Sequence, residues 1–195
     1  MIFCRSKESA ERTLQNILPF IEGKLFLKVN RNKTCIEHIE KVKYLGYSFY
    51  YQEEFRFRFR VHSKTIEKIK KKIKELTSRS NAWSNEMRIL KLKQYIRGWI
   101  NYFKLADMEN LLKRTDEWMR RRIRVVYWKQ WKKIRTKIRK LRSLKLPEWA
   151  VLQLANSRKG IWRSLLVLNC ALTKQVISNL GYTYMVDYYL KVREN

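Results

Sequence analysis

Residues 94–133, QYIRGWINYFKLADMENLLKRTDEWMRRRIRVVYWKQWKK, contain most of two helical patterns around which the chain is arranged. At about 100° per residue, roughly a third of the helix circumference is shared by Ile89, Leu92, Ile96, Trp99, Ile100 and Phe103. Lys93, Arg97 and Lys104 fall together on the neighbouring sector. The first pattern therefore predicts a helix with one face buried in a core and an adjacent face that is solvated and positive.

The second pattern has an apolar stripe that begins at Leu112 and a cationic face on another side of the helix. Arg114, Arg121, Trp128 and Lys132 follow one another on that face at spacings of seven, seven and four residues. An aromatic ring among guanidinium and ammonium groups suits a polymer of phosphates and stackable bases. We interpret the two helices together as a surface that faces RNA. The alternative for any single residue is a solvated position on a basic helix that covers a core.

The charge balance of the chain also favours a nucleic-acid partner. Forty-five Lys and Arg residues oppose seventeen Asp and Glu residues in a chain of 195, which gives a formal net charge of +28. Repulsion of this size destabilises a compact state unless an anionic partner screens it. A membrane surface is the weaker alternative, because the cations lie among many Trp and Tyr residues in helical patterns. No apolar run approaches the roughly 18 residues that a bilayer-spanning helix needs, so no membrane partner is expected.

The cysteines and histidines argue against disulfides and structural metals. Cys4, Cys35 and Cys170 are odd in number and far apart, which disfavours a disulfide framework and favours a reducing compartment. His38 and His62 have no ligand-rich neighbourhood, and no cysteine pair has the spacing of a zinc site. The amino terminus lacks the apolar segment of a secretory signal.

The acidic residues do not form a catalytic pattern. Asp107, Asp116 and Asp187 are far apart in the sequence, and the adjacent Glu53 and Glu54 would point to opposite faces of a strand. Metal-dependent nucleotidyl transfer needs clustered carboxylates that hold two cations about 4 Å apart. The sequence has no glycine-rich phosphate loop and no nucleophile elbow. We therefore expect no catalytic residues and no metal ligands in this chain.

The first third of the chain predicts one helix and several strands. Ser6 is a good N-cap for a helix that Pro19 should distort and Gly23 should end. Gly46 should mark a bulge or a close backbone approach. The strict alternation FRFRFR at 55–60 is the clearest strand pattern. Predicted strands cover residues 1–5, 25–29, 35–39, 43–51 and 55–60.

Helical periodicity replaces the strand pattern at Ser63, where we place the main boundary. A lysine-rich helix should cover 65–77, and the two long helices should join near Ala106 and Asp107. Pro147 should open a short helix that ends near Asn156. The last predicted elements are a basic loop at 156–160 with Ile161 and Trp162 as an anchor, a helix at 168–180 closed by Gly181, and an aromatic helix at 182–192.

Four stretches in this order carry a family resemblance. They are IFCRSKESAERTL at 2–14; LKVNRNKT at 27–34 with VKYLGYSFY at 42–50; RGWINYF at 97–103 with DEWMRRRIRVVYWKQWKK at 116–133; and ANSRKGIW at 155–162 with LNCALTKQVISNLGYTYMVDYYLKVRE at 168–194. Together they resemble the carboxy-terminal half of group II intron-encoded reverse transcriptase/maturases. The first two stretches resemble the end of the polymerase palm, the third the thumb or X maturase region, and the fourth the tail of bacterial members.

The resemblance implies an α+β fold in three parts. A truncated palm remnant of one helix and antiparallel strands would occupy residues 1–62. A mainly helical thumb/maturase-specific domain would occupy residues 63–145, and a helical maturase tail residues 146–195.

The same resemblance implies that polymerase chemistry is missing. In the family, a Tyr-Ala-Asp-Asp-like tetrad that helps to hold catalytic Mg²⁺ lies just before the segment that matches residues 1–4. Its aspartates have no matching position here. We therefore expect no enzymatic activity from this chain alone and no cofactor. The alternative is a piece of a split RNA-directed DNA polymerase that is active only with an upstream segment.

The function implied by the resemblance is RNA binding that assists intron splicing, in the cytoplasm of a bacterium. The partners would be structured group II intron RNA and, further, a DNA target and an upstream reverse-transcriptase fragment. Two competing hypotheses are a degenerate gene remnant without a present role and a basic protein of the ribosomal or DNA-binding type. The candidate RNA-binding residues are Lys93, Arg97, Lys104, Arg114, Arg120, Arg121, Arg122, Arg124, Lys129, Lys132, Lys133, Arg158 and Lys159.

Overall fold

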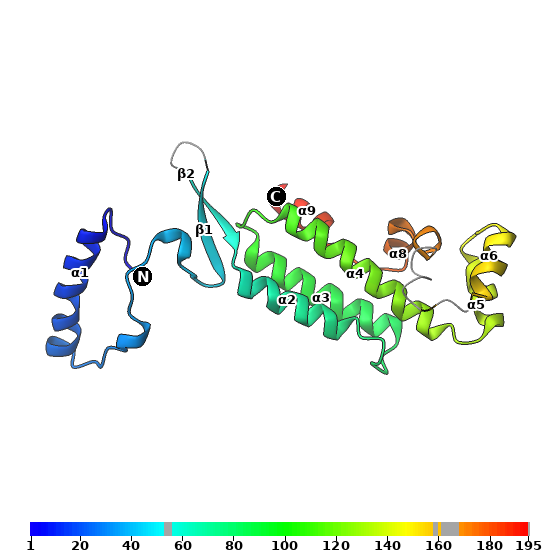
Figure 1. Cartoon of the computed structure of the whole chain (residues 1–195), viewed down its shortest axis with the longest axis horizontal. Coiled ribbons are helices and arrows are strands. Elements are labelled where there is room, and N and C mark those ends of the chain that lie inside the picture. The colour runs from blue at the N-terminus through cyan, green and yellow to red at the C-terminus, as the bar shows by residue number, and fades with distance from the viewer. Residues whose placement is uncertain (53–55, 158–159, 161–167, 195) are drawn as a thin grey trace.

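The chain builds one β-hairpin and a set of helices, most of which follow the hairpin (Figure 1). The computed structural model describes residues 1–52, 56–157, 160 and 168–194. This arrangement confirms the predicted α+β class with a mainly helical part after the strands. The elements are α1 Lys7–Pro19, the π-helix η1 Phe20–Lys24, the 3₁₀ turns η2 Arg31–Lys33 and η3 Ile39–Lys41, β1 Tyr47–Gln52, β2 Arg56–Val61, α2 Ser63–Leu76, α3 Asn85–Phe103, α4 Glu109–Gln130, α5 Ile134–Ser143, α6 Glu148–Ala155, α8 Lys174–Asn179 and α9 Met185–Glu194.

The hairpin is held by aromatic pairs across its two antiparallel strands. Phe49 lies opposite Phe59, and Tyr51 lies opposite Phe57. The ring centroids are 5.5 Å apart in the first pair and 4.2 Å apart in the second. Aromatic pairs at such positions stabilise antiparallel strands. The strand predicted at 55–60 is thus confirmed from residue 56, where the described part of β2 begins.

Gly46 seats the hairpin on the helices. Its φ of +89° is in the left-handed region, and a Cβ atom there would lie 3.0 Å from the Phe103 ring and 3.1 Å from Thr65 Oγ1. The Thr65 hydroxyl donates to the Gly46 carbonyl at 3.1 Å. Only glycine combines this φ with this close approach at low cost. The predicted close backbone approach at Gly46 is confirmed.

Three strands predicted before the hairpin, at residues 1–5, 25–29 and 35–39, are wrong. The structure gives these segments no strand, and Phe26 adopts a φ of +56° and is 86 % exposed. A strand forms only where its backbone N–H and C=O groups find a neighbour. Within the described residues, β1 and β2 pair with each other and form the only sheet. The apolar runs therefore had no sheet to join in this chain.

Helix α1 begins as predicted and ends differently. The Ser6 hydroxyl accepts a hydrogen bond from the Ser9 N–H at 3.2 Å, which confirms the N-cap. Pro19 is the last residue of α1, but a π-helical turn follows and passes through Gly23 to Lys24. Gly23 therefore does not end the helical segment. No residue of α1 is buried, and α1 lies apart from the other helices (Figure 1).

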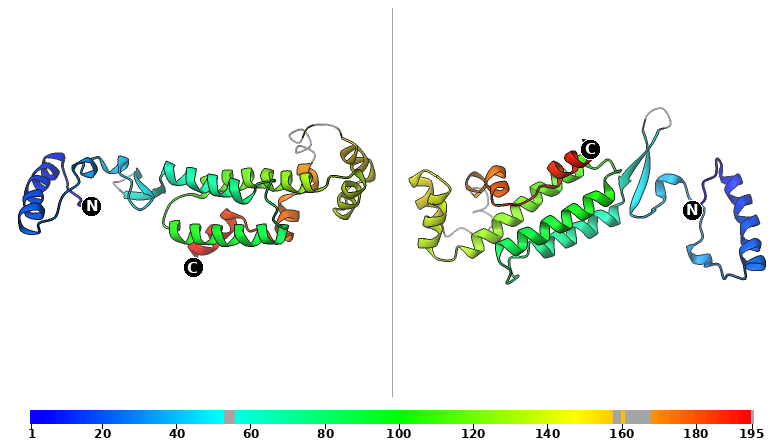
Figure 2. Two further views of the ribbon diagram at one scale, coloured as in Figure 1. Left: turned by 90° about the horizontal axis from the view of Figure 1, so that it is seen from below. Right: turned by 180° about the vertical axis from the view of Figure 1, so that it is seen from behind.

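Four helices form the main body in two layers. Helix α2 packs beside α4, and α3 packs beside α9, while α2 also contacts α3 and α4 contacts α9. The left view of Figure 2 shows α2 and α4 on one side and α3 and α9 on the other. Helix α2 begins at Ser63, where the sequence predicted the change of period. The cationic faces of α3 and α4 consequently belong to different layers.

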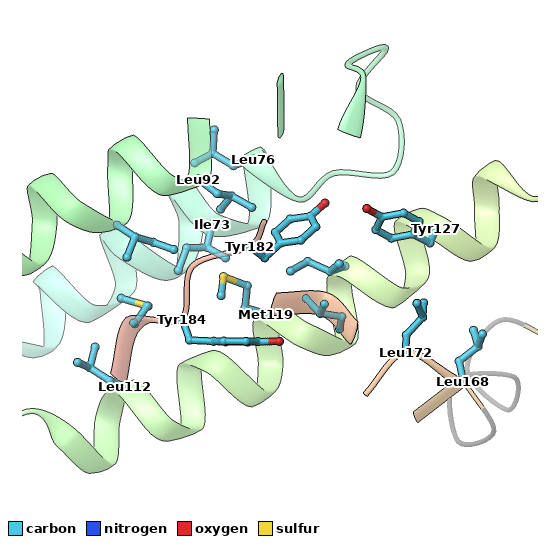
Figure 3. Packing of buried hydrophobic residues seen from close by; sticks show 14 of the residues in the cluster. Ile73, Leu76, Leu92, Leu112, Met119, Tyr127, Leu168, Leu172, Tyr182 and Tyr184 are labelled. Carbon is cyan, nitrogen blue, oxygen red and sulfur yellow. The ribbon is translucent and has the colours of Figure 1, made fainter. Parts of the chain in front are cut away.

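The core lies between these layers, and the apolar stripes predicted for α3 and α4 supply much of it. Phe103 is buried and Trp99 is half-buried, as expected for core positions. The tail contributes Tyr182, Tyr184 and Met185 to the same cluster (Figure 3). Other fully buried members are Ile69, Ile73, Leu92, Ile96, Ile100, Leu112, Met119 and Ile123.

Two predicted helices toward the end of the chain differ from the structure. Helix α4 ends at Gln130, so the chain turns at 131–133 before α5 begins. The single helix predicted at 168–180 is wrong, because the chain breaks after Ala171 and restarts at α8. The Thr173 hydroxyl caps α8 by accepting from the Val176 N–H at 3.3 Å. Gly181, with a φ of +98°, follows α8 as predicted, and the predicted Trp162 anchor lies outside the described residues.

A buried carboxylate on α4 caps α9. Asp116 is 3 % exposed, and its two oxygens accept the N–H groups of Met185 and Val186, each at 3.0 Å. These are the first N–H groups of α9, which have no partner inside their own helix. Burial raises the pKa of Asp116 to about 6, although the two backbone hydrogen bonds act in the opposite direction.

A second aspartate joins the hairpin, the α3–α4 turn and α9. Asp107 Oδ2 accepts from the Tyr50 hydroxyl at 2.9 Å and from Arg58 Nη1 at 3.3 Å, and Asp107 Oδ1 lies 3.1 Å from Arg193 Nη1. Burial alone would raise the pKa of Asp107, but these three hydrogen bonds lower it. Asp107 is therefore a structural anion.

We predict that Asp116 makes stability depend on pH in the acidic range. Its pKa rises from 3.8 to about 6 on folding, so the unfolding free energy is highest below about pH 4, falls as pH rises through 6 and is constant above that. A shift of this size corresponds to about 3 kcal/mol. Urea unfolding between pH 4 and 7 should show a steeper fall of the unfolding free energy for the wild type than for Asp116→Asn. The exposed neighbour Glu117 supplies the control, Glu117→Gln, whose profile should follow the wild type; equal profiles for Asp116→Asn and the wild type would contradict the assignment.

Candidate nucleic-acid interface

Arg122 fixes α4 against the carboxyl end of α2. Its Nε donates to Thr77 Oγ1 at 2.6 Å, and its Nη2 donates to the Lys74 carbonyl at 2.9 Å. The last carbonyl groups of a helix lack partners inside the helix and carry partial negative charge, so a cation is favourable there. Burial lowers the pKa of Arg122. Arg122 therefore has a structural role, and it sets which side of α4 lies next to α2.

Exposed cations lie on the neighbouring sides of α2 and α4 near Arg122. Along α4, residues on this side recur at spacings of three, four and seven, as one helical face requires. On α2, Lys70 and Lys71 lie one turn before Lys74, whose carbonyl Arg122 binds, and all three lysines are exposed. We call this surface the α2–α4 face; it consists of Lys70, Lys71, Lys74, Arg114, Trp118, Arg121, Arg122 and Lys129.

Trp118 is the aromatic residue of this surface, whereas the sequence pattern pointed to Trp128. Trp118 is half-buried, and the Arg122 guanidinium carbon lies 5.3 Å from its ring centroid. Trp128 is 7 % exposed, packs against Trp131 at 6.2 Å and is covered by the Lys137 ammonium at 4.4 Å. The placement of Trp128 on an exposed cationic face is therefore wrong. The turn after α4 folds back over this position and buries it.

Arg124 was also a candidate RNA contact, and the structure places it inside the protein. It is 7 % exposed, and its Nε donates to the Leu172 carbonyl at 2.8 Å. Burial lowers the pKa of Arg124. The guanidinium joins α4 to the end of the helical turn before α8, so it cannot reach a phosphate without leaving that carbonyl. Arg120 is half-buried beside it, with its guanidinium carbon 5.6 Å from the Tyr184 ring centroid.

The candidates on α3 lie in the other layer. Arg97 is exposed, and its guanidinium carbon is 5.5 Å from the ring centroid of Tyr188 on α9. Lys93 is half-exposed and Lys104 is exposed, both on this flank of α3. Helix α3 lies on the other side of the main body from α2 and α4, as the left view of Figure 2 shows, so these cations do not extend the α2–α4 face. The structure thus divides the predicted single surface into two.

The remaining candidates lie beyond α4. Lys132 and Lys133 are exposed in the turn between α4 and α5. Arg158 and Lys159 lie outside the described residues.

A second cationic feature on α5 was not among the predicted contacts. Arg135, Arg139 and Arg142 line a groove of about 410 Å³ together with Ile138. Arg142 forms an ion pair with Glu148, whereas Arg135 and Arg139 are exposed. The spacing of four and three residues in the sequence could have identified this stripe. The spacing of Lys70, Lys71 and Lys74 in the sequence could likewise have identified them as the exposed side of an amphipathic helix.

The described part of the chain offers no metal centre. No group of three or more His, Cys, Asp or Glu residues is placed to hold an ion among these residues. The three aspartates have other roles, since Asp107 and Asp116 make the hydrogen bonds given above and Asp187 pairs with Lys174 at 3.1 Å. No helix in the residues that the structure covers is long and apolar enough to cross a bilayer. The surface chemistry is that of a cation-rich face for a polyanion.

The helical part of the chain matches a known protein family. Residues 66–145, which contain nearly all of α2 and the whole of α3, α4 and α5, match the family described as the group II intron, maturase-specific domain. No curated protein matched the chain in a separate comparison. The α2–α4 face lies wholly within the matched residues. Residues 66–145 are therefore similar to the maturase-specific domain of group II intron proteins, which supports a maturase carboxy-terminal region.

Proposed function

We propose that this protein binds folded group II intron RNA through the α2–α4 face and assists splicing without catalysing nucleotide addition itself. The observation that carries the proposal is the combination of this exposed basic face with the family match over the same residues. Arg122 holds the two helices in a fixed arrangement, so the exposed cations are positioned before RNA arrives. Helices that are already fixed add no cost of ordering the backbone when RNA binds.

The physical basis of the binding is phosphate neutralisation with a smaller aromatic contribution. Each Lys or Arg that neutralises a phosphate releases condensed counterions, so affinity falls steeply with salt. Trp118 can stack on an unpaired base at the edge of the face, since its side chain is partly exposed. The proposal needs no cofactor, and it locates the protein with its RNA in the cytoplasm of a bacterial cell.

We predict that neutralising the outer cations of α4 weakens RNA binding more than neutralising those of α3. Arg114→Gln/Arg121→Gln/Lys129→Gln removes three charges from the α2–α4 face without touching Arg122. The affinity for a folded group II intron RNA at 0.1 M salt should fall about 10- to 100-fold, and the slope of log K against log salt should become less negative by up to about three. Filter binding at several salt concentrations measures both quantities.

The matched control is Lys93→Gln/Arg97→Gln/Lys104→Gln, which removes the same number of charges from the other layer. Its affinity should stay within about threefold of the wild type. Equal losses of affinity for the two triple variants would contradict the proposal. Equal affinity of the wild type for intron RNA and for tRNA would contradict it too, because either result means that the protein binds RNA only through its overall positive charge.

A second candidate is suggested by the segment before the hairpin. Helix α1 has no buried residue, Phe3, Phe20 and Phe26 are each at least half exposed, and the hairpin is a sheet of only two strands among the described residues. Exposed strand edges and apolar side chains favour a further protein partner. An upstream reverse-transcriptase fragment would supply the missing sheet and carboxylates. Co-expression with such a fragment should then give primer extension that neither part shows alone; its absence would reject this alternative.

A further inference from the structure

A cleft lies at the seam between α2 and α3, away from the α2–α4 face. It has a volume of about 430 Å³ and opens to solvent beside the loop that joins the two helices. Trp83 and Tyr95 provide its aromatic walls, and Lys91 and Gln94 from α3 provide its polar groups. Pockets that hold small ligands occupy about 300–1,000 Å³ and combine apolar walls with few polar groups.

The aromatic walls are positioned for stacking. Trp83 and Tyr95 are half-buried and pack against the core, and burial raises the pKa of Tyr95. The Lys91 ammonium lies 4.0 Å from the centroid of the Trp83 ring. A cation beside an aromatic plane recurs where proteins hold single-stranded nucleic acid, because the ring stacks on a base and the cation attracts the phosphate.

The charges of the cleft leave one cation free for a ligand. Lys72 is bound by both carboxylate oxygens of Glu75, at 2.9 and 3.0 Å, so this pair is locally neutral. Lys91 contacts the Trp83 ring and no carboxylate within the described chain. The exposed Gln94 amide carries both a donor and an acceptor, as the edge of a base does. One base and one phosphate would satisfy these groups.

The loop that carries Trp83 is fixed at both ends. Asn81 Nδ2 donates to the Glu75 carbonyl at 2.9 Å, and the Ser84 hydroxyl accepts from the Met87 N–H at 3.2 Å. Arg88, which is 1 % exposed, donates to the Ser78 carbonyl at 3.4 Å. The cleft is therefore formed without a ligand, which lowers the entropic cost of binding.

We propose that this cleft binds one unpaired nucleotide of the RNA, with the base stacked on Trp83 in place of the Lys91 ammonium that lies over the ring, and with its phosphate beside Lys91. The inference rests on the proposed function and adds a second kind of contact to it. The α2–α4 face can bind the phosphates of both paired and unpaired RNA, whereas the cleft accepts only an unpaired base. The cleft would make the protein favour RNA with unpaired nucleotides over a continuous helix.

The test compares a single-stranded RNA dodecamer with a hexamer-pair duplex of similar total charge. Trp83→Leu should lower the affinity for the single strand about tenfold and leave duplex affinity unchanged, since stacking on one aromatic contributes at about this level. The control is Trp149→Leu on α6, because Trp149 is 71 % exposed and lies outside the cleft. Loss of both affinities to the same degree in Trp83→Leu, with an unchanged thermal transition, would overturn the inference.

A measurement on the unmodified protein removes any dependence on how the variant folds. Photocrosslinking of the single strand carrying 4-thiouridine, followed by mass spectrometry, should place crosslinks on the peptides that contain Trp83 and Tyr95. Crosslinks confined to other peptides would overturn the inference. The proposed function would survive that result if folded intron RNA still lost affinity in the α4 triple variant, so the two failures are distinguishable.

Discussion

The packing of the helices depends on the hydrogen bonds between the buried carboxylate of Asp116 on α4 and the first N–H groups of α9. A buried charge is costly unless hydrogen bonds satisfy it, and here the unpaired N–H groups at the start of α9 do so at 3.0 Å. The interaction satisfies both sides at once, because the helix end needs acceptors and the carboxylate needs donors. It brings the end of the chain back onto α4 and completes the second layer beside α3. Tyr182, Tyr184 and Met185 then reach the core.

This layered packing decides what each arginine can do. Those at the seams between elements bind carbonyl groups: Arg122 at the end of α2, Arg124 at Leu172 and Arg88 at Ser78. The arginines on the outer side of α4, Arg114 and Arg121, do not hold such a carbonyl group and remain exposed. A basic helix thus contains two populations of cations with different energetics, since a desolvated guanidinium holds the fold and a solvated one is available to phosphates. The solvated cations form the α2–α4 face, and the desolvated arginines hold in place the helices that carry it.

The sequence predicted features that depend on local chemistry and missed those that depend on distant neighbours. The Ser6 cap, the close approach at Gly46 and the stripe through Ile96 and Ile100 follow from spacing and residue type alone. The strands before the hairpin failed because strand formation needs a partner strand. Periodicity could likewise place Trp128 beside cations but could not show that Trp131 and Lys137 of α5 cover it. Periodicity also grouped the basic faces of α3 and α4, which the packing of the helices places in different layers (Figure 2).

Lysine footprinting can show whether intron RNA binds to the α2–α4 face. The protein would be acetylated briefly with and without a folded group II intron RNA, and each lysine followed by mass spectrometry. The account predicts protection of Lys70, Lys71, Lys74 and Lys129, with Lys104 on α3 modified equally in both states. Protection of Lys104 as strong as that of the α2 lysines, or no protection of the α2 lysines, would contradict it.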